Sequence, residues 1–228
     1  PLKHWLRYTF NYANRLEIGL VGAQDAGEPF FKRQNKTGYD YHSFYLMLRN
    51  QGSLKALAVG RYRLRMGMGL VMNCDYGFGK QMLLQALDRS FATVRPHSSR
   101  SEGNYLQGVA VTFKLNKVME ATAFLSYRKV DATLRHDSLG SISSIITNGY
   151  HRTETEMEHK HNTWQLATGG HLRYFNNGFH AGATALYTAL SRELRPHTTQ
   201  LYKRWAATGT RFYNLGIDYG YTGHRFSL

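Results

Sequence analysis

The sequence predicts an all-β fold, an antiparallel up-and-down transmembrane β-barrel present in part, with about ten strands, short periplasmic turns and long outer loops. Apolar and polar residues alternate over long segments, as they do in strands with two different faces. Tight turns and long polar stretches also alternate between these segments, and membrane barrels place short turns at one end and long loops at the other. No run approaches the ~18 apolar residues that a transmembrane helix requires.

Composition is consistent with one β-barrel region spanning 1–228. The chain has 16 Tyr, 12 Phe, 3 Trp and 22 Gly. Its mean hydropathy of -0.47 argues against helical insertion but suits a barrel, in which half of each strand faces a polar interior. The single cysteine, Cys74, excludes an internal disulfide. A net charge of +14 favours an acidic partner such as nucleic acid or anionic lipid without choosing between them.

Nine complete strands are predicted in chain order, and a tenth begins at 225–228. Their ranges are 3–12, 16–24, 39–49, 53–72, 104–115, 118–130, 162–175, 179–191 and 210–221. Tight turns are expected at 12–15, 49–52, 115–117, 176–178 and 222–224, and long loops at 24–38, 74–102, 132–161 and 193–209. Because bacterial barrels generally contain an even number of strands, we expect further strands outside this chain.

The hairpin at 164–189 shows the alternation most clearly. Trp164, Leu172 and Tyr174 share one face of its first strand, whereas His171 and Arg173 share the other. The aromatic residues at the two ends of the apolar face are about a membrane thickness apart on a tilted strand. A soluble antiparallel sheet with one wet face would give the same alternation, so the loop asymmetry is what favours a barrel.

Five basic residues are predicted to line the lumen. They are Arg61, Arg63, Arg65, His171 and Arg173. The three arginines share one face of the strand 53–72, and the opposite face is apolar. If that apolar face meets lipid, the guanidiniums form a positive lining that favours anions. Alternatively, they pair with lumen carboxylates such as Glu120 or Asp218 and only fill the interior.

A second basic set lies in the expected outer loops. It consists of Lys32, Arg33, Arg95, Arg100 and Arg195. These side chains would match the phosphates of lipopolysaccharide. DNA would match them equally well in charge, but no helix-turn-helix, zinc finger or ribonucleoprotein motif is present to read bases. The segment 79–89 predicts a short amphipathic helix that plugs the lumen, caps the rim or packs under the loops.

Histidines and glutamates are concentrated at 151–161. In an extended chain His159 and His161 point the same way, which makes them weak metal-ligand candidates. The spacing of known zinc and calcium loops is missing, so the sequence predicts no metal and no cofactor.

A membrane-embedded hydrolase would need a Ser-His or Asp-His pair held at the barrel rim. The residues available for such a pair are Asp25, His97, Ser98 and Ser99. Nothing in the sequence fixes their geometry, and we expect no enzymatic activity.

Several segments resemble a family of outer-membrane barrel proteins in Bacteroidetes whose longer members carry an N-terminal helix-hairpin-helix region. The segments are DAGEPFF at 25–31, YRLRMGMGLVM at 62–72, HSSRSE at 97–102, GYHRTE at 149–154 and KHNT at 160–163. The resemblance implies an outer-membrane location and a barrel that continues beyond Leu228, and it implies no catalytic residue. The helix-hairpin-helix region, which contacts DNA backbone in other proteins, is not in this chain. Family members favour Gly-Gln-Gly-Leu where this chain has GMGL at 67–70.

These observations predict a component of the cell outer membrane that acts in channel formation, transport or surface anchoring. Its expected partners are membrane lipid, lipopolysaccharide and further barrel strands. Two alternatives stay open: a barrel that binds or takes up DNA at the cell surface, and an outer-membrane hydrolase.

Overall fold

The computed structural model describes residues 2–31, 35, 38–74, 93–135, 137, 140–199 and 201–223. Strands make up most of these residues, and the described part contains one short α-helix, α2 (Glu154–His159), and two 3-10 turns, η1 (Gly67–Gly69) and η2 (Leu201–Lys203). None of these helices is long and apolar enough to cross a membrane. The predicted all-β class is confirmed.

Nine strands follow one another in a single antiparallel sheet. They are β1 (His4–Tyr12), β2 (Leu16–Gln24), β3 (Tyr41–Gln51), β4 (Leu54–Met66), β7 (Leu106–Lys114), β8 (Met119–Leu134), β10 (Thr163–Asn176), β11 (Phe179–Leu194) and β12 (Gly209–Tyr221). Eight correspond closely to predicted segments. The predicted strand 53–72 is shorter, because β4 ends at Met66. The segment 225–228 lies outside the described residues.

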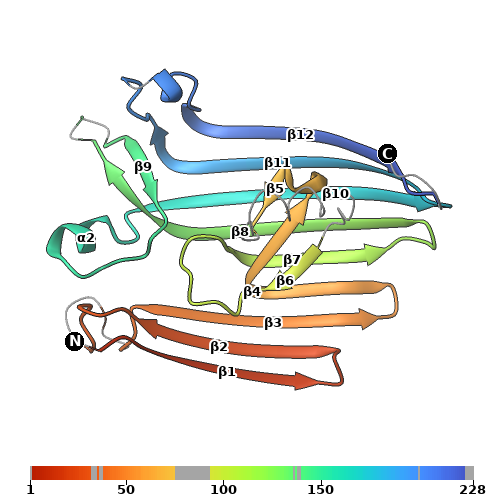
Figure 1. The fold of residues 1–228 in the computed structure, drawn as a ribbon, viewed down its shortest axis with the longest axis horizontal. Coiled ribbons are helices and arrows are strands. Elements are labelled where there is room, and N and C mark those ends of the chain that lie inside the picture. The colour runs from red at the N-terminus through yellow and green to blue at the C-terminus, as the bar shows by residue number, and fades with distance from the viewer. Residues whose placement is uncertain are drawn as a thin grey trace.

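The two ends of the sheet differ in how the strands are connected. Figure 1 shows the tight turns together at the end where β1, β3, β7 and β10 finish, and β9 (Ile142–Ile146), α2 and the longer connections at the other end. In the β10–β11 turn, Asn177 and Gly178 adopt φ values of 49° and 83°. A Cβ on Gly178 would lie 2.4 Å from the carbonyl oxygen of Thr222, so this turn requires glycine. We refer to the tight-turn end and the loop end.

Strand β4 separates from β3 at Gly60, which lies opposite a second glycine in β7. Gly60 and Gly108 are register partners with φ values of 94° and 150°. A Cβ on either would lie 2.3 Å from a neighbouring carbonyl oxygen, that of Phe44 or Leu125. Only glycine allows this close approach and bend.

Beyond the bend, β4 pairs with β5 (Met72–Asn73) and β6 (Thr93–Pro96). We call residues 62–74 and 93–96 the covering hairpin, because Figure 1 shows this part of the chain lying across β7, β8 and β10. At its tip, a Cβ on Gly67 would lie 3.1 Å from the Thr184 side chain of β11. The hairpin therefore crosses one face of the sheet, which we call the covered face.

The main apolar core lies between the covering hairpin and the covered face. Its buried members are Met47, Ala58, Tyr62, Leu64, Met66, Cys74, Leu106, Ala110, Phe124 and Ala167. The Tyr62 hydroxyl lies 3.1 and 2.9 Å from the carbonyl oxygens of Val109 and Leu125, either of which can accept its hydrogen bond. The expectation that the apolar side of 53–72 meets lipid is wrong for Tyr62, Leu64 and Met66. The bend turns these side chains onto the sheet, and at most 1% of each is exposed.

The opposite face, which we call the open face, carries large apolar side chains that stay exposed. Among the exposed residues, Leu20 is the register partner of Phe44, and Val59, Val109 and Leu125 form a row across β4, β7 and β8. At a neighbouring level the covered face buries a polar row, Thr112, Thr122, His171 and Thr184. In 118–130 and 162–175, the residues predicted to share the apolar face and those predicted to share the polar face do so in the structure.

Candidate functional site

A cavity of about 720 Å³ lies between the covering hairpin and the tight-turn end of the covered face. Five basic residues from β3, β4, β6 and β10 line it, and its described lining contains no carboxylate. The five are Arg49, Lys55, Arg63, Arg95 and Arg173. We call it the basic cavity.

Two carboxylates, Glu120 and Glu17, pair with three of these residues. Glu120 accepts hydrogen bonds from the Lys55 ammonium at 2.7 Å, and its Oε2 lies 3.8 Å from Nη1 of Arg173. Glu17 accepts a hydrogen bond from Arg49 at 2.9 Å. Arg49 on β3, Lys55 at the start of β4 and Arg173 on β10 are therefore each paired with one of two carboxylates.

Arg63 and Arg95 lie directly opposite each other in the antiparallel β4–β6 ladder. The next register pair, Leu64 and Val94, packs with the main core, and side chains alternate along a strand. The two arginines consequently share the other side of the hairpin, which faces the basic cavity. Like charges directly opposite each other disfavour a strand pair.

Of the five predicted lumen residues, two line the basic cavity, Arg63 and Arg173. Arg61 instead lies between two aromatic rings, with its Cζ 4.5 Å from the ring centres of both Tyr41 and Tyr105. The predicted pairing of lumen arginines with Glu120 exists for Arg173.

Arg65 and His171 do not line the basic cavity. Arg65 is the register partner of both Thr93 in β6 and Asn73 in β5. The His171 ring is buried, and its Nδ1 lies 2.8 Å from Oγ1 of Thr184. By alternation Arg65 therefore lies on the same side of β4 as Arg63 and is half-buried, whereas His171 belongs to the buried polar row of the covered face.

The outer-loop candidates are separated by the fold. Arg95 was expected in a long loop but lies in β6, because the segment 93–96 pairs with β4. Arg195 follows β11 and forms an ion pair with Glu193 at 2.9 Å. Arg100 lies at the loop end in a second, smaller pocket. Lys32 and Arg33 lie outside the described residues, as does the predicted helix 79–89.

Sequence reasoning missed Arg49 and Lys55 as members of the site. A signal was available for Arg49, because it continues the alternation of Tyr45 and Met47, which are buried on the covered face. The face on which Lys55 lies could not be predicted in the same way, because the register between β4 and β7 shifts between Leu54 and Ala56.

A buried ionic network at the loop end joins three parts of the chain. Nδ1 of His151 lies 2.5 Å from Asp40, and its Nε2 lies 2.9 Å from Asp131. The His151 backbone N–H donates to Glu28 at 3.2 Å, and Lys160 donates to Asp40 at 2.7 Å. We call these five residues the His151 cluster.

The protonation of the His151 cluster follows from its contacts. Burial lowers the pKa of His151, but hydrogen bonds to Asp131 and Asp40 outweigh that effect and raise it to about 10. Burial alone would raise the pKa of Asp40, yet hydrogen bonds from His151 and Lys160 lower it to about 2. Burial raises the pKa of nearby Glu102 to about 8. At neutral pH His151 is therefore a cation between two carboxylates.

Glu28, Asp40 and His151 place ligand atoms within 4.8 Å of one another, which is the kind of oxygen and nitrogen set that zinc uses. However, both His151 ring nitrogens already contact carboxylates, and Lys160 contacts Asp40. His151 and Lys160 therefore supply the positive charge that a metal ion would supply to these carboxylates. His159 and His161 join no group of three metal ligands within the described residues.

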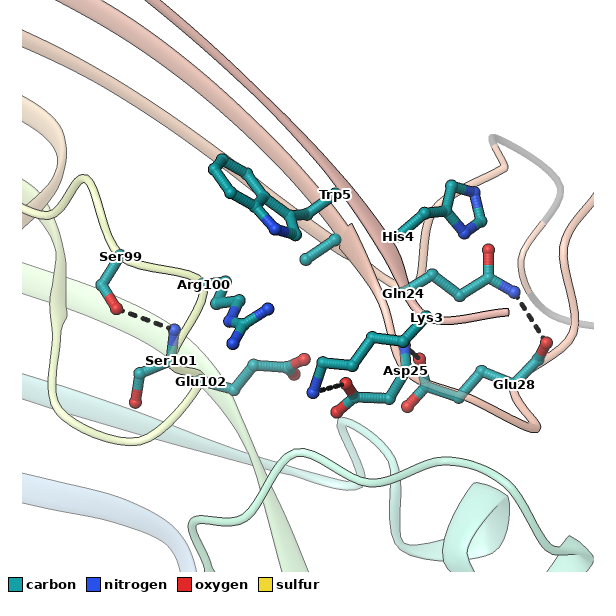
Figure 2. A pocket seen from close by; sticks show the side chains of 11 residues that line it. Lys3, His4, Trp5, Gln24, Asp25, Glu28, Ser99, Arg100, Ser101 and Glu102 are labelled. Atoms are coloured by element: carbon teal, nitrogen blue, oxygen red, sulfur yellow. Dashed lines mark hydrogen bonds and ion pairs between the residues drawn. The ribbon is translucent and has the colours of Figure 1, made fainter. Parts of the chain in front are cut away.

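A pocket of about 230 Å³ adjoins the His151 cluster, and Figure 2 shows the side chains that line it. Lys3 pairs with Asp25 across its floor, and Gln24 donates to the backbone carbonyl of Glu28 at 2.7 Å. Glu102 projects into the same space from the facing loop. The pocket thus mixes both signs of charge and closes the loops against the start of β1.

The residues considered for hydrolysis do not form a nucleophile-base pair. The Ser99 hydroxyl accepts a hydrogen bond from the Ser101 backbone, and Nε2 of His97 contacts the Ser101 carbonyl oxygen at 2.9 Å. Burial lowers the pKa of His97 to about 4. Within the described residues no hydrogen bond joins His97 to Ser98 or Ser99.

Comparison of the chain with family models, with curated proteins and with solved structures finds no match. The proposed function therefore rests on the geometry and chemistry of the structure.

Proposed function

We propose that this chain forms part of the wall of an outer-membrane β-barrel, with the covered face toward the interior, and that it acts as a channel, transport or surface-anchoring component. The open face carries the argument, because every one of the nine strands exposes at least one large apolar side chain. In water a continuous apolar patch rarely exceeds a few hundred Å². In a bilayer such a face is required.

The aromatic residues of this face support a membrane orientation. Trp164 contacts Tyr127 at the loop end of β10, with ring centres 5.9 Å apart, and Tyr174 contacts Phe179 at the tight-turn end, at 6.4 Å. Trp164 and Tyr174 are ten residues apart, which corresponds to about 34 Å of strand. Tilted by about 45°, that length spans ~24 Å, close to the ~25 Å apolar band between the aromatic girdles of barrels.

The covered face supports the other half of the proposal. It buries a polar row and holds the covering hairpin, as expected of a barrel interior partly filled by a segment of the chain. The basic cavity beside the hairpin leaves a charged space, which favours passage or retention of anions.

Arginine substitutions at two depths test the membrane orientation. Leu125→Arg places a charge at the middle of the open face, where we expect a loss of about 2–4 kcal/mol in folding stability in lipid vesicles. Leu115→Arg, at the tight-turn end, is the matched control and should cost about 0–1 kcal/mol. Urea titration of vesicle-inserted protein measures both. Equal, small losses would be the behaviour of a sheet in water and would contradict the proposal.

Measuring conductance across planar bilayers distinguishes a transport role from an anchoring role. An anion-selective conductance from the full-length protein supports a channel, and no conductance leaves only the anchoring role. The DNA alternative rests on the net charge of +14 and predicts DNA binding that weakens steeply with salt. A hydrolase would require turnover that is abolished by Ser99→Ala.

A further inference from the structure

We infer that the pocket of about 230 Å³ at the loop end, which we call the loop-end pocket, binds a free amino acid as its zwitterion. The ammonium group of the ligand binds to Gln24 and His4 on the strand side of the pocket. Its carboxylate binds to Arg100 and Glu102 on the loop side. The inference goes beyond the proposed function and does not rest on it, because none of these contacts requires a membrane.

The first support is an amide oxygen in the pocket lining that is buried without a partner. Only 6% of Gln24 is exposed, and its Nε2 donates to the backbone carbonyl of Glu28 at 2.7 Å, which fixes the orientation of the amide. Oε1 of Gln24 has no hydrogen-bond partner among the described residues, and the same holds for Nδ1 of His4, its register partner in β1. An ammonium group can donate to the amide oxygen, and also to Nδ1 when the ring proton is on Nε2.

The second support is a pair of donors on the other side of the pocket. Arg100 and Glu102 lie across it from Gln24, in the connection between β6 and β7 (Figure 2). Burial raises the pKa of Glu102 to about 8, and the carboxylates of the His151 cluster add to this effect, whereas His151 itself opposes it. At neutral pH Glu102 is therefore mostly protonated and can donate a hydrogen bond. The Arg100 guanidinium presents a fork of donors that matches the two oxygens of a carboxylate.

The third support is the size of the pocket together with its mixed charge. Sites for drug-sized ligands measure about 300–1,000 Å³, so a pocket of about 230 Å³ suits a smaller molecule. Lys3 pairs with Asp25 in the lining, and Glu28 lies on the side of Gln24. A multiply charged anion would therefore meet acidic side chains in the same pocket. A zwitterion instead finds acceptors for its ammonium group and donors for its carboxylate.

Titration calorimetry with L-alanine, on the whole chain in detergent micelles at neutral pH, tests the inference directly. We expect saturable binding. Ethylamine and propionate each keep only one of the two charged groups of L-alanine. Both should bind tenfold or more weakly, because each loses the charge-assisted hydrogen bonds on one side of the pocket.

Variants on each side of the pocket assign the two contacts. Arg100→Gln should weaken the binding of L-alanine tenfold or more, because it removes the charged partner of the carboxylate. The matched control is Arg195→Gln, which removes the same charge from an arginine outside this pocket and should change the affinity less than about twofold. Gln24→Met should weaken ethylamine binding and leave propionate binding unchanged.

Two substitutions of Glu102 test its role as a donor. The amide of Glu102→Gln can donate as a protonated carboxyl group does, so the affinity for L-alanine should stay within about twofold. Glu102→Met has a side chain of similar length without a donor and should bind L-alanine more weakly. If Glu102→Gln is as weak as Glu102→Met, the assignment of Glu102 is wrong.

Each other outcome has a defined meaning. No binding of L-alanine by the unmodified chain, or equal losses in Arg100→Gln and Arg195→Gln, would overturn the inference. Ethylamine or propionate binding as tightly as L-alanine would show a site for a simple cation or anion and would overturn the zwitterion. If Gln24→Met misfolds, Arg100→Gln still decides, because the Arg100 side chain is exposed. The Leu125→Arg comparison in vesicles leaves this pocket intact, so either test can fail while the other succeeds.

Discussion

At the loop end of the covered face, His151 lies between the carboxylates of Asp40 and Asp131, whereas at the tight-turn end Arg63 lies opposite Arg95. Both regions concentrate charge, but the His151 cluster brings cations and carboxylates together, whereas the described lining of the basic cavity contains five basic residues and no carboxylate. A self-neutralised buried network holds loops together, and removing one member leaves an unpaired charge. Three predictions test this contrast.

The largest effect is expected from His151→Ala. It leaves Asp40 and Asp131 buried and facing each other, which should destabilise the loop end by about 3–5 kcal/mol. Hydrogen exchange at the amides of 149–161 measures the loss. His159→Ala, in the last turn of α2, is the control and should leave exchange nearly unchanged.

The second prediction concerns pH. The folded pKa of His151, about 10, lies above its ordinary value of 6.5, so its contribution to stability is complete below about pH 6.5 and is lost as pH rises toward 10. The raised pKa of Glu102, about 8, acts in the same direction from pH 4.5 upward. Asp40 acts oppositely, and its contribution is lost only as pH falls from about 3.8 toward 2.

Exchange protection of the loop end should therefore fall at least tenfold between pH 6.5 and 9, after correction for intrinsic exchange rates. Arginines keep their charge throughout this range, so protection of the covering hairpin should stay constant. A loop-end profile that is equally flat would mean that His151 is not charged between its two carboxylates.

The smallest effect, and the sharpest contrast in sign, is expected from Arg95→Gln. Removing one of two opposed like charges should stabilise the covering hairpin by about 0.2–1 kcal/mol in buffer free of multivalent anions. Thermal unfolding measures the change. Arg195→Gln removes an exposed arginine paired with Glu193 and should be neutral or slightly destabilising. Destabilisation by Arg95→Gln without anion would contradict the like-charge interpretation.

Much of the sheet could be predicted from local pattern. Side chains alternate with period two, so the residues of β8 and β10 alone determine which of their side chains share a face. Turn positions such as Asn177 and Gly178 are equally local, because they depend on the φ values that a residue type tolerates.

The sites depended on contacts between distant segments. Asp40 and His151 are 111 residues apart, and no spacing rule links them. Arg95 lies opposite Arg63 only because β4 bends at Gly60 and receives β6 as a partner. The alternation in 53–72 is the same whether its apolar side meets lipid or packs on the sheet, so period two could not decide the direction.

The sequence by itself therefore determined the nine main strands, their two faces and the tight turns, because backbone geometry and side-chain alternation act within a few residues. It did not predict β6 and β9, which lie in segments expected to be loops. Only the tertiary structure decided that the second half of β4 folds across the sheet, that Tyr62 and Leu64 form the core there, and that Arg63 faces a cavity. The physical reason is that burial of an apolar face lowers the free energy against any suitable partner surface, and the chain fold selects which surface is within reach.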